Sequence, residues 1–124
     1  MKAIIAVNNK QYIGLNNKLL WKSKEDLKHF KQLTEGQRLL VGYNTFTELP
    51  PLKNRTLIID QRNEFLSADW CIGGKKTYEK YCHLFTELHI SKIDNDDIGD
   101  TEYPNLENLN PECKVFTYYF STTD

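Results

Sequence analysis

The sequence predicts an α/β fold, in which helices cover both faces of a central, mostly parallel sheet. Three short apolar runs, at residues 3–7 (AIIAV), 38–41 (RLLV) and 56–59 (TLII), are typical of strands buried on both faces. Segments with helical or turn patterning separate these runs along the chain. Strands that alternate with helices form parallel sheets, because each crossover brings the chain back to the same edge.

The first helix is expected from Lys24 to the glycine at position 36. Ser23 is a good N-cap, and Gly36 suits the C-terminal end. Residues 8–17, which include Gly14, have turn chemistry and are expected to form a loop. A short helical turn is expected at 45–49, ended by two prolines, and a longer helix at 75–84.

The remaining strands are expected at 69–72 (DWCI), 88–93 (LHISKI) and 115–120 (VFTYYF). The 88–93 segment alternates apolar and polar residues, as a half-buried strand does. The 115–120 segment is rich in aromatic residues, which strands favour. Ligands of such sheets bind beyond the carboxyl ends of the strands, so the loops at that edge are candidates for a functional site.

Composition excludes several classes of protein. At 124 residues the chain fits a single domain, residues 1–124. Sixteen basic residues against seventeen acidic ones argue against a nucleic-acid partner, and no apolar run approaches the roughly 20 residues of a membrane span. The three cysteines include no CxxC pair, so neither a disulfide framework nor a metal site is expected. Reduced cysteines are typical of the cytoplasm, which is the expected location.

Asp26 allows two interpretations. As the third residue of the helix it could complete a capping box with Ser23, where the helix dipole also favours an acid. At 100° per residue, however, it falls among Leu27, Phe30 and Leu33 on the apolar face. A carboxylate there needs a partner, and a ligand presenting two adjacent N–H groups would supply one.

Three further segments lie at expected strand ends. Gly73 and Gly74 precede a helix, and with Lys75 and Lys76 they could approach a phosphate, although a tight turn explains two glycines equally well. The segment 42–45 (GYNT) is either a second nucleotide-facing loop or a capped turn. Arg55 opens a strand, where it could grip a carboxylate or lie in solvent.

Taken in order, the motifs of this chain resemble those of the dihydrofolate reductase family from Ala3 to about Pro104. The similarity is carried by IIAV…IGLNNKLLW (4–21), KEDLKHFKQLT (24–34), VGYNTF (41–46), LKNRTLII (52–59), IGGKKTYE (72–79), LHISKID (88–94) and GDTEYP (99–104). The resemblance implies NADPH-dependent hydride transfer to 7,8-dihydrofolate, yielding tetrahydrofolate, with the protein orienting two rings beside a desolvated carboxylate.

Matching positions imply roles for individual residues. Asp26 is expected to pair with the pterin, Ser91 to hydrogen-bond Asp26, and Trp21 to close the loop and hold a water. The expected folate-binding residues are Ile5, Leu27, Phe30, Leu49, Leu52, Arg55 and Ile72. Arg55 is expected to grip the glutamate-tail carboxylate, and the carbonyls of Ile5 and Ile72 to face the pterin.

The resemblance also implies a cofactor site for NADPH. The residues expected there are Ala6, Ile13, Gly14, Gly42, Tyr43, Asn44, Thr45, Arg62, Gly73, Gly74, Lys75, Lys76, Thr77 and Tyr78. Arg62 is expected at the 2′-phosphate and Tyr78 at the nicotinamide. Residues 15–20 would be a mobile loop over the site, braced by Asp100 and Thr101. Dihydrofolate is the expected binding partner, and the protein is expected to be a monomer.

The chain departs from the family pattern in several places. Tyr43 stands where the family usually has arginine, and Leu20 stands where it has proline. The segment between Ile59 and Ile72 is short, and the C-terminal antiparallel hairpin is shortened or reduced to one strand. These losses leave two alternatives open: an inactive relative that serves as a binding or structural module, and a reductase of the related pyrimidine-reducing branch.

Overall fold

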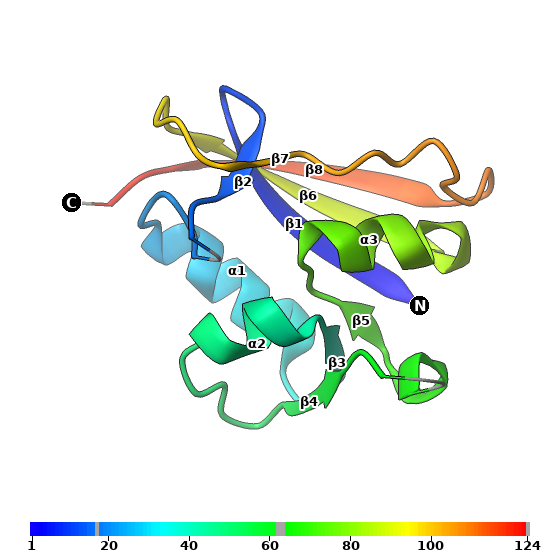
Figure 1. The fold of residues 1–124 in the computed structure, drawn as a ribbon. Helices are drawn as coiled ribbons and strands as arrows, with labels where there is room; N and C mark the ends of the chain where they lie inside the picture. Colours follow the sequence, from blue (N-terminus) through cyan, green and yellow to red (C-terminus); the bar gives the residue numbers. More distant parts are fainter. Residues whose placement is uncertain (17, 62–63, 124) are drawn as a thin grey trace.

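The protein, seen in a computed structural model that describes residues 1–16, 18–61 and 64–123, is built around a six-stranded sheet (Figure 1). The strand order is β4-β3-β5-β1-β6-β8, and every neighbouring pair is parallel. The strands are β1 (Lys2–Asn8), β3 (Arg38–Val41), β4 (Thr56–Ile59), β5 (Trp70–Cys71), β6 (Glu87–Asp94) and β8 (Lys114–Ser121). The parallel sheet expected from the sequence is confirmed.

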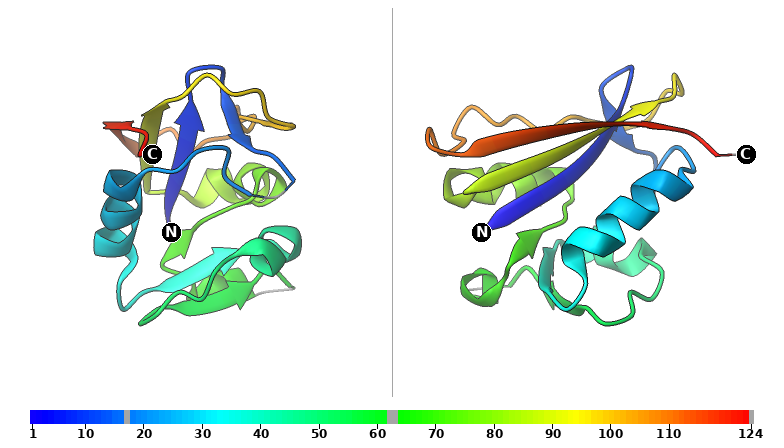
Figure 2. Two further views of the ribbon diagram at one scale, coloured as in Figure 1. Left: turned by 90° about the vertical axis from the view of Figure 1, so that its left-hand side faces the viewer. Right: turned by 180° about the vertical axis from the view of Figure 1, so that it is seen from behind.

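Helices cover both faces of this sheet, as Figure 2 shows in its left-hand view. Helix α1 (Lys24–Thr34) lies on one face, where Phe30 and Leu33 pack against Ile4, Leu39 and Trp70. Helices α2 (Tyr43–Glu48) and α3 (Lys75–Tyr81) lie on the other. The sheet therefore has a core on each side.

The core beneath α3 is the larger of the two. It contains Tyr78, Tyr81, Cys82, Phe85 and Leu88, with β-strand residues below them. Burying these apolar side chains supplies the main driving force for folding. No helix in the described ranges is both long enough and apolar enough to cross a membrane.

The elements differ most from the expected ones in three places, and several other boundaries shift by one or two residues. Helix α2 begins at Tyr43 rather than Thr45, and α3 ends at Tyr81, where a 3₁₀ turn, η2 (Cys82–Leu84), takes over. The expected loop at 8–17 contains a short strand, β2 (Tyr12–Gly14), which pairs antiparallel with β7 (Thr101–Glu102). So short a strand has almost no sequence pattern of its own, because its partner lies far along the chain.

Two regions were expected to be shorter than in the family: the connection between β4 and β5, and the segment after β7. A 3₁₀ turn, η1 (Glu64–Ser67), is the element seen between β4 and β5 in the described part of that connection. After β7 the chain forms the single strand β8, which pairs parallel to β6 at the edge of the sheet. In place of a C-terminal hairpin, this part of the chain thus contributes one edge strand.

Candidate active site

Asp26 is the most unusual residue of helix α1. It is only 7% exposed, whereas Leu27 beside it is 52% exposed. Its backbone N–H donates to the Ser23 hydroxyl at 3.2 Å, so Ser23 caps the helix as expected. Across the described residues, the Asp26 carboxylate makes no return bond to the Ser23 N–H and no ion pair with Lys, Arg or His. The carboxylate therefore points into the fold without a protein cation.

Burial has an electrostatic consequence for this carboxyl group. Desolvation raises the pKa of Asp26 above its ordinary value of 3.8, because the charged form loses water. The nearby Ser91 hydroxyl lowers the pKa and offsets part of this rise. A raised pKa on a buried acid without a cation is typical of a functional position.

Two other buried polar atoms, one in Ser91 and one in Trp21, have no hydrogen-bond partner among the described residues. Ser91, on β6, is 1% exposed, and its Oγ makes no hydrogen bond of ordinary geometry within the described residues. The indole Nε1 of Trp21, just before α1, is likewise buried without a partner there. Since buried polar atoms are nearly always hydrogen-bonded, unpaired ones favour a site that a ligand or water completes.

Arg55 lies beside the apolar part of helix α1. Its guanidinium stands 5.8 Å over the Phe30 ring, and Nη1 donates to the Thr34 hydroxyl at 3.4 Å. Leu52 and Ile72 pack against the same cluster of Ile4, Leu39 and Trp70 as Phe30 does. An arginine held at the mouth of an apolar wall can bind a carboxylate with two parallel N–H groups.

Three glycines form a tight cradle between α2 and α3. The Gly42 N–H donates to the Gly73 carbonyl at 2.8 Å, which ties the two turns together. A Cβ on Gly42 would lie 2.7 Å from the Thr77 hydroxyl, and one on Gly74 2.7 Å from the Thr45 hydroxyl. Gly73 has a φ of +114°, which favours glycine. Only glycine fits these positions without displacing a neighbour.

Hydrogen bonds to Asp100 hold the start of the connection from β2 to α1 in place. The Asn16 N–H donates to the Asp100 carboxylate at 3.0 Å, and the Asp100 N–H donates to the Gly14 carbonyl at 3.1 Å. Thr101 pairs with Gly14 in the β2–β7 ladder. The hydrogen bonds from Asn16 and Thr101 lower the pKa of Asp100, so this carboxylate is ionised at neutral pH. The expected contact of residues 15–20 with Asp100 is present at Asn16, whereas Thr101 contacts Gly14, just before these residues.

The structure also places the remaining expected residues. Ile5 is buried in β1, and Ala6, Ile13 and Leu49 are half-buried. Lys75 and Lys76 open α3, next to the Gly73–Gly74 turn, whereas Asn44 and Tyr43 lie at the surface and Tyr43 is 64% exposed. Arg62 lies outside the described residues, so its expected contact with a 2′-phosphate stays a prediction.

One contact was not expected from the sequence. The Tyr78 hydroxyl donates to the Ile4 carbonyl at 2.6 Å, and its ring lies against Gly73. Burial raises the pKa of Tyr78 well above 10, so the hydroxyl stays a donor. Tyr78 thereby links the glycine cradle to β1, the strand whose Ile4 packs against helix α1. Nothing in the local pattern of residues 75–84 indicates this bond, since its acceptor lies in β1.

Comparison with known proteins indicates the family of this chain. A family model described as dihydrofolate reductase matches residues 1–71. Dihydrofolate reductase of Buchnera aphidicola subsp. Schizaphis graminum (strain Sg) is 30% identical over 139 residues, covering 94% of this chain and 84% of the relative. Dihydrofolate reductase type 1 of Escherichia coli is 28% identical over 146 residues, covering 98% and 91%.

A solved structure shows the same fold. Dihydrofolate reductase from Enterococcus faecalis, complexed with NADP(H) and RAB-propyl, superposes with a TM-score of 0.75 at 26% identity. The match covers 86% of this chain and 77% of that one. On the family match and these similarities, the chain belongs to the dihydrofolate reductase family.

Proposed function

We propose that this protein is an NADPH-dependent dihydrofolate reductase, which reduces 7,8-dihydrofolate to tetrahydrofolate. The observation that carries the proposal is Asp26, a buried carboxyl with a raised pKa and no cation from the described chain beside it. A dihydropterin ring offers an amino group and a ring N–H side by side. A carboxylate binds such a pair of donors with both oxygens.

The substrate would lie against the face of α1 that carries Asp26. Leu27 is half exposed and Phe30 half-buried, so both can receive an aromatic ring without unfolding the helix. Arg55, stacked over Phe30, would receive the carboxylate of the substrate's tail. Leu49, Leu52 and Ile72 would complete the apolar wall.

The glycine cradle fits a dinucleotide cofactor. The close approaches at Gly42 and Gly74 leave backbone where side chains would otherwise stand, which lets a pyrophosphate approach the chain. The hydroxyls of Thr45 and Thr77 lie at this cradle, with Lys75 and Lys76 next to it. NADPH held there would supply the hydride.

The reaction requires one hydride at a pterin carbon and one proton at the neighbouring nitrogen. In this proposal Asp26 holds the pterin edge and, through its charge, makes that nitrogen more basic. Ser91 steadies the carboxyl group, and the Trp21 indole N–H holds a water near the ring. The 15–20 connection limits access of bulk water, and Tyr78 keeps β1 aligned with the cradle.

An activity assay with paired variants tests the proposal. Purified protein should oxidise NADPH only when dihydrofolate is present, and Asp26→Asn should abolish nearly all of this turnover. Glu25→Gln, which changes the exposed acid next along the same helix, is the matched control and should keep its activity. Ligand binding without turnover in the unaltered protein would favour the non-enzymatic module instead.

A further inference from the structure

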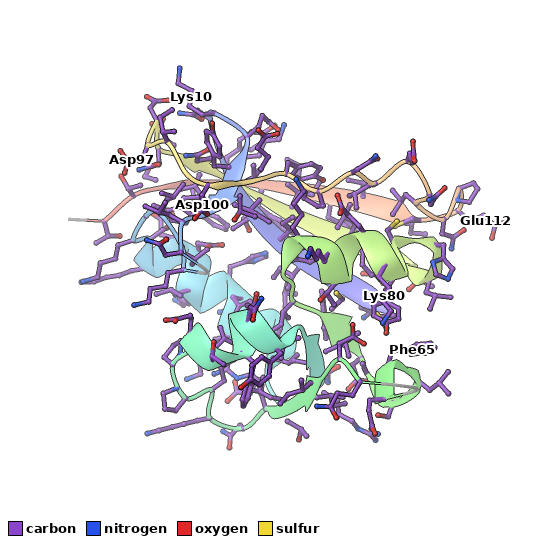
Figure 3. All side chains as sticks on the ribbon, viewed as in Figure 1. Lys10, Phe65, Lys80, Asp97, Asp100 and Glu112 are labelled. Carbon is purple, nitrogen blue, oxygen red and sulfur yellow. The ribbon has the colours of Figure 1, made fainter. Side chains whose placement is uncertain are left out.

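The chain that follows β8 contacts the start of helix α1. Figure 3 shows it leaving the sheet beside α1, at the end of the molecule where Asp97 lies. The Thr123 N–H donates to the Lys22 carbonyl at 2.6 Å, and the Lys24 N–H donates to the Thr123 hydroxyl at 3.0 Å. Thr123 therefore binds the backbone on both sides of Ser23, the N-cap of the helix.

These bonds complete the cap of α1. The first N–H groups of an α-helix have no acceptor within the helix, so another part of the structure must supply one. The Ser23 hydroxyl accepts from the Asp26 N–H, and the Thr123 hydroxyl accepts from the Lys24 N–H. Thr123 lies 99 residues after Lys24 in the sequence. The first turn is thus held both by its neighbour in the chain and by a distant residue.

The strand that leads to Thr123 is paired with the strand that carries Ser91. Strands β6 and β8 are hydrogen-bonded along their whole length, and Ser91 lies opposite Tyr118 in this ladder. The Ser91 hydroxyl is also the polar group that acts on the Asp26 carboxyl. Because β8 ends at Ser121, only one residue separates it from Thr123. Thr123 therefore ties the helical turn that carries Asp26 to the pair of strands that carries Ser91.

A second contact joins α1 to β8 farther along the helix. The His29 ring lies 4.1 Å from the Tyr118 ring and 5.3 Å from the Phe120 ring. Asp26 lies between this aromatic contact and the hydrogen bonds of Thr123 at the helix start. The helix is thus supported on both sides of Asp26, and loss of the Thr123 hydroxyl would weaken the support on one side.

We propose that Thr123 is a positioning residue for Asp26, whose first helical turn it holds against the β6–β8 pair so that the carboxyl stays buried beside Ser91. The need for that position in hydride transfer rests on the function proposed above. A carboxylate that must meet two donors at once tolerates little displacement. Thr123 acts on the reaction through the helix alone.

The first test measures hydrogen exchange by NMR in the free protein. Thr123→Val keeps the shape of the side chain and removes the acceptor of the Lys24 amide. This amide should then exchange about two- to tenfold faster, the range that one hydrogen bond supplies. Thr123→Ser restores the hydroxyl and should restore slow exchange. Thr122→Val, at the exposed threonine just before it, is the matched control and should leave the exchange unchanged.

The titration of Asp26 separates a positioning role from a purely structural one. Desolvation is the larger cause of its raised pKa, and the Ser91 hydroxyl opposes this rise. When the first turn loosens, water reaches the carboxyl, so the pKa of Asp26 should fall toward 3.8 in Thr123→Val. NMR of the carboxyl carbon measures this pKa in the folded protein, where a loss of global stability alone does not change it. An unchanged pKa of Asp26, unchanged exchange of Lys24, or equal effects of Thr122→Val would each overturn the proposal.

Turnover tests the consequence for the reaction. With dihydrofolate and NADPH, kcat should fall about two- to tenfold in Thr123→Val and recover in Thr123→Ser. The affinity for NADPH should stay unchanged, because the glycine cradle follows β3 and β5, on other strands of the sheet. Altered exchange and pKa with an unchanged kcat would overturn the role in the reaction.

The free-protein measurements also keep this proposal separate from the proposed function. An unaltered protein that binds its ligands without turnover would contradict the reductase assignment. The exchange of Lys24 and the pKa of Asp26 would then still decide whether Thr123 positions the carboxyl.

Discussion

Asp26 places a carboxyl group where water is largely excluded, so its ionised form works against stability. Its pKa in the folded protein lies above the unfolded value of 3.8. The protonated carboxyl is therefore favoured by folding, so this stability is fully present below pH 3.8 and is lost as pH rises through the raised pKa. A purely structural role would not require an acidic side chain at this buried position.

A single substitution separates stability from function at this position. Asp26→Asn should raise the midpoint of thermal unfolding at neutral pH, because it removes the buried charge and keeps the shape. The same change should lower turnover by about a hundredfold or more, as loss of an acid–base group does. Calorimetry and the NADPH assay check the two effects. An unchanged turnover would contradict the catalytic role.

His29, three residues after Asp26 on α1, introduces a second pH dependence. Its ring lies 4.1 Å from Tyr118 and 5.3 Å from Phe120, and its Nε2 is buried without a partner among the described residues. Burial and the nearby His89 lower the pKa of His29 below 6.5. The unfolded chain thus takes up a proton first, so stability is constant above pH 6.5 and falls below it.

Urea unfolding at several pH values should show this loss. The unfolding midpoint of the unaltered protein should fall between pH 6.5 and more acidic values, and His29→Leu should flatten that part of the curve. His83→Gln, at an exposed histidine on the 3₁₀ turn η2, is the control and should leave the curve as it was. A curve that His29→Leu leaves equally steep would contradict the assignment.

At the scale of elements, the glycine turns before α2 and α3 leave no room for a side chain at Gly42 or Gly74. Gly74→Ala puts a methyl group 2.7 Å from the Thr45 hydroxyl. We expect the affinity for NADPH to fall about tenfold or more, because small displacements in a binding turn have large effects. Equilibrium titration of NADPH measures this change.

Gly36→Ala provides the matched comparison. Gly36 has a φ of +75° at the end of α1, with open space around it. The substitution should cost about 1 kcal/mol of folding free energy from backbone strain, and should leave NADPH affinity unchanged. If Gly36→Ala weakened NADPH binding as much as Gly74→Ala does, the loss would reflect general destabilisation.

Elements differ in how far their sequence predicts them. The β3 and β4 strands fall on the expected residues, because continuous apolar runs between turn residues mark buried strands. The α1 boundaries follow from Ser23 and Gly36. The β2–β7 pair was not predicted, because a three-residue strand is stabilised by its distant partner. The same reason applies to the Tyr78–Ile4 hydrogen bond.

At the scale of the whole molecule, the core beneath α3 stabilises the sheet on which the site is built. Phe85 is fully buried there, among Tyr81, Cys82 and Leu88. Phe85→Ala should lower the free energy of unfolding by about 3–5 kcal/mol, through lost burial and the cavity that remains. Leu66→Ala, at an exposed position, should change it by less than about 0.5 kcal/mol. Chemical denaturation of both variants measures the difference.

In the candidate site too, features set by local sequence could be predicted, and contacts between distant parts of the chain could not. Asp26 could be predicted, since its helical angle places it on an apolar face, and the structure confirms that it is buried. Its approach to Ser91 could be expected only from the family resemblance, because β6 lies far along the chain. The ion pair between Lys18 and Glu48 could not be predicted, since each residue alone is an ordinary surface charge.

The central claim is that this member of the dihydrofolate reductase family transfers hydride beside Asp26. The most direct measurement is the loss of reduced-nicotinamide absorbance in a mixture of protein, NADPH and dihydrofolate. The account predicts oxidation that requires both ligands and that Asp26→Asn nearly abolishes while Glu25→Gln does not. No oxidation by correctly folded protein, or equal oxidation by both variants, would contradict it.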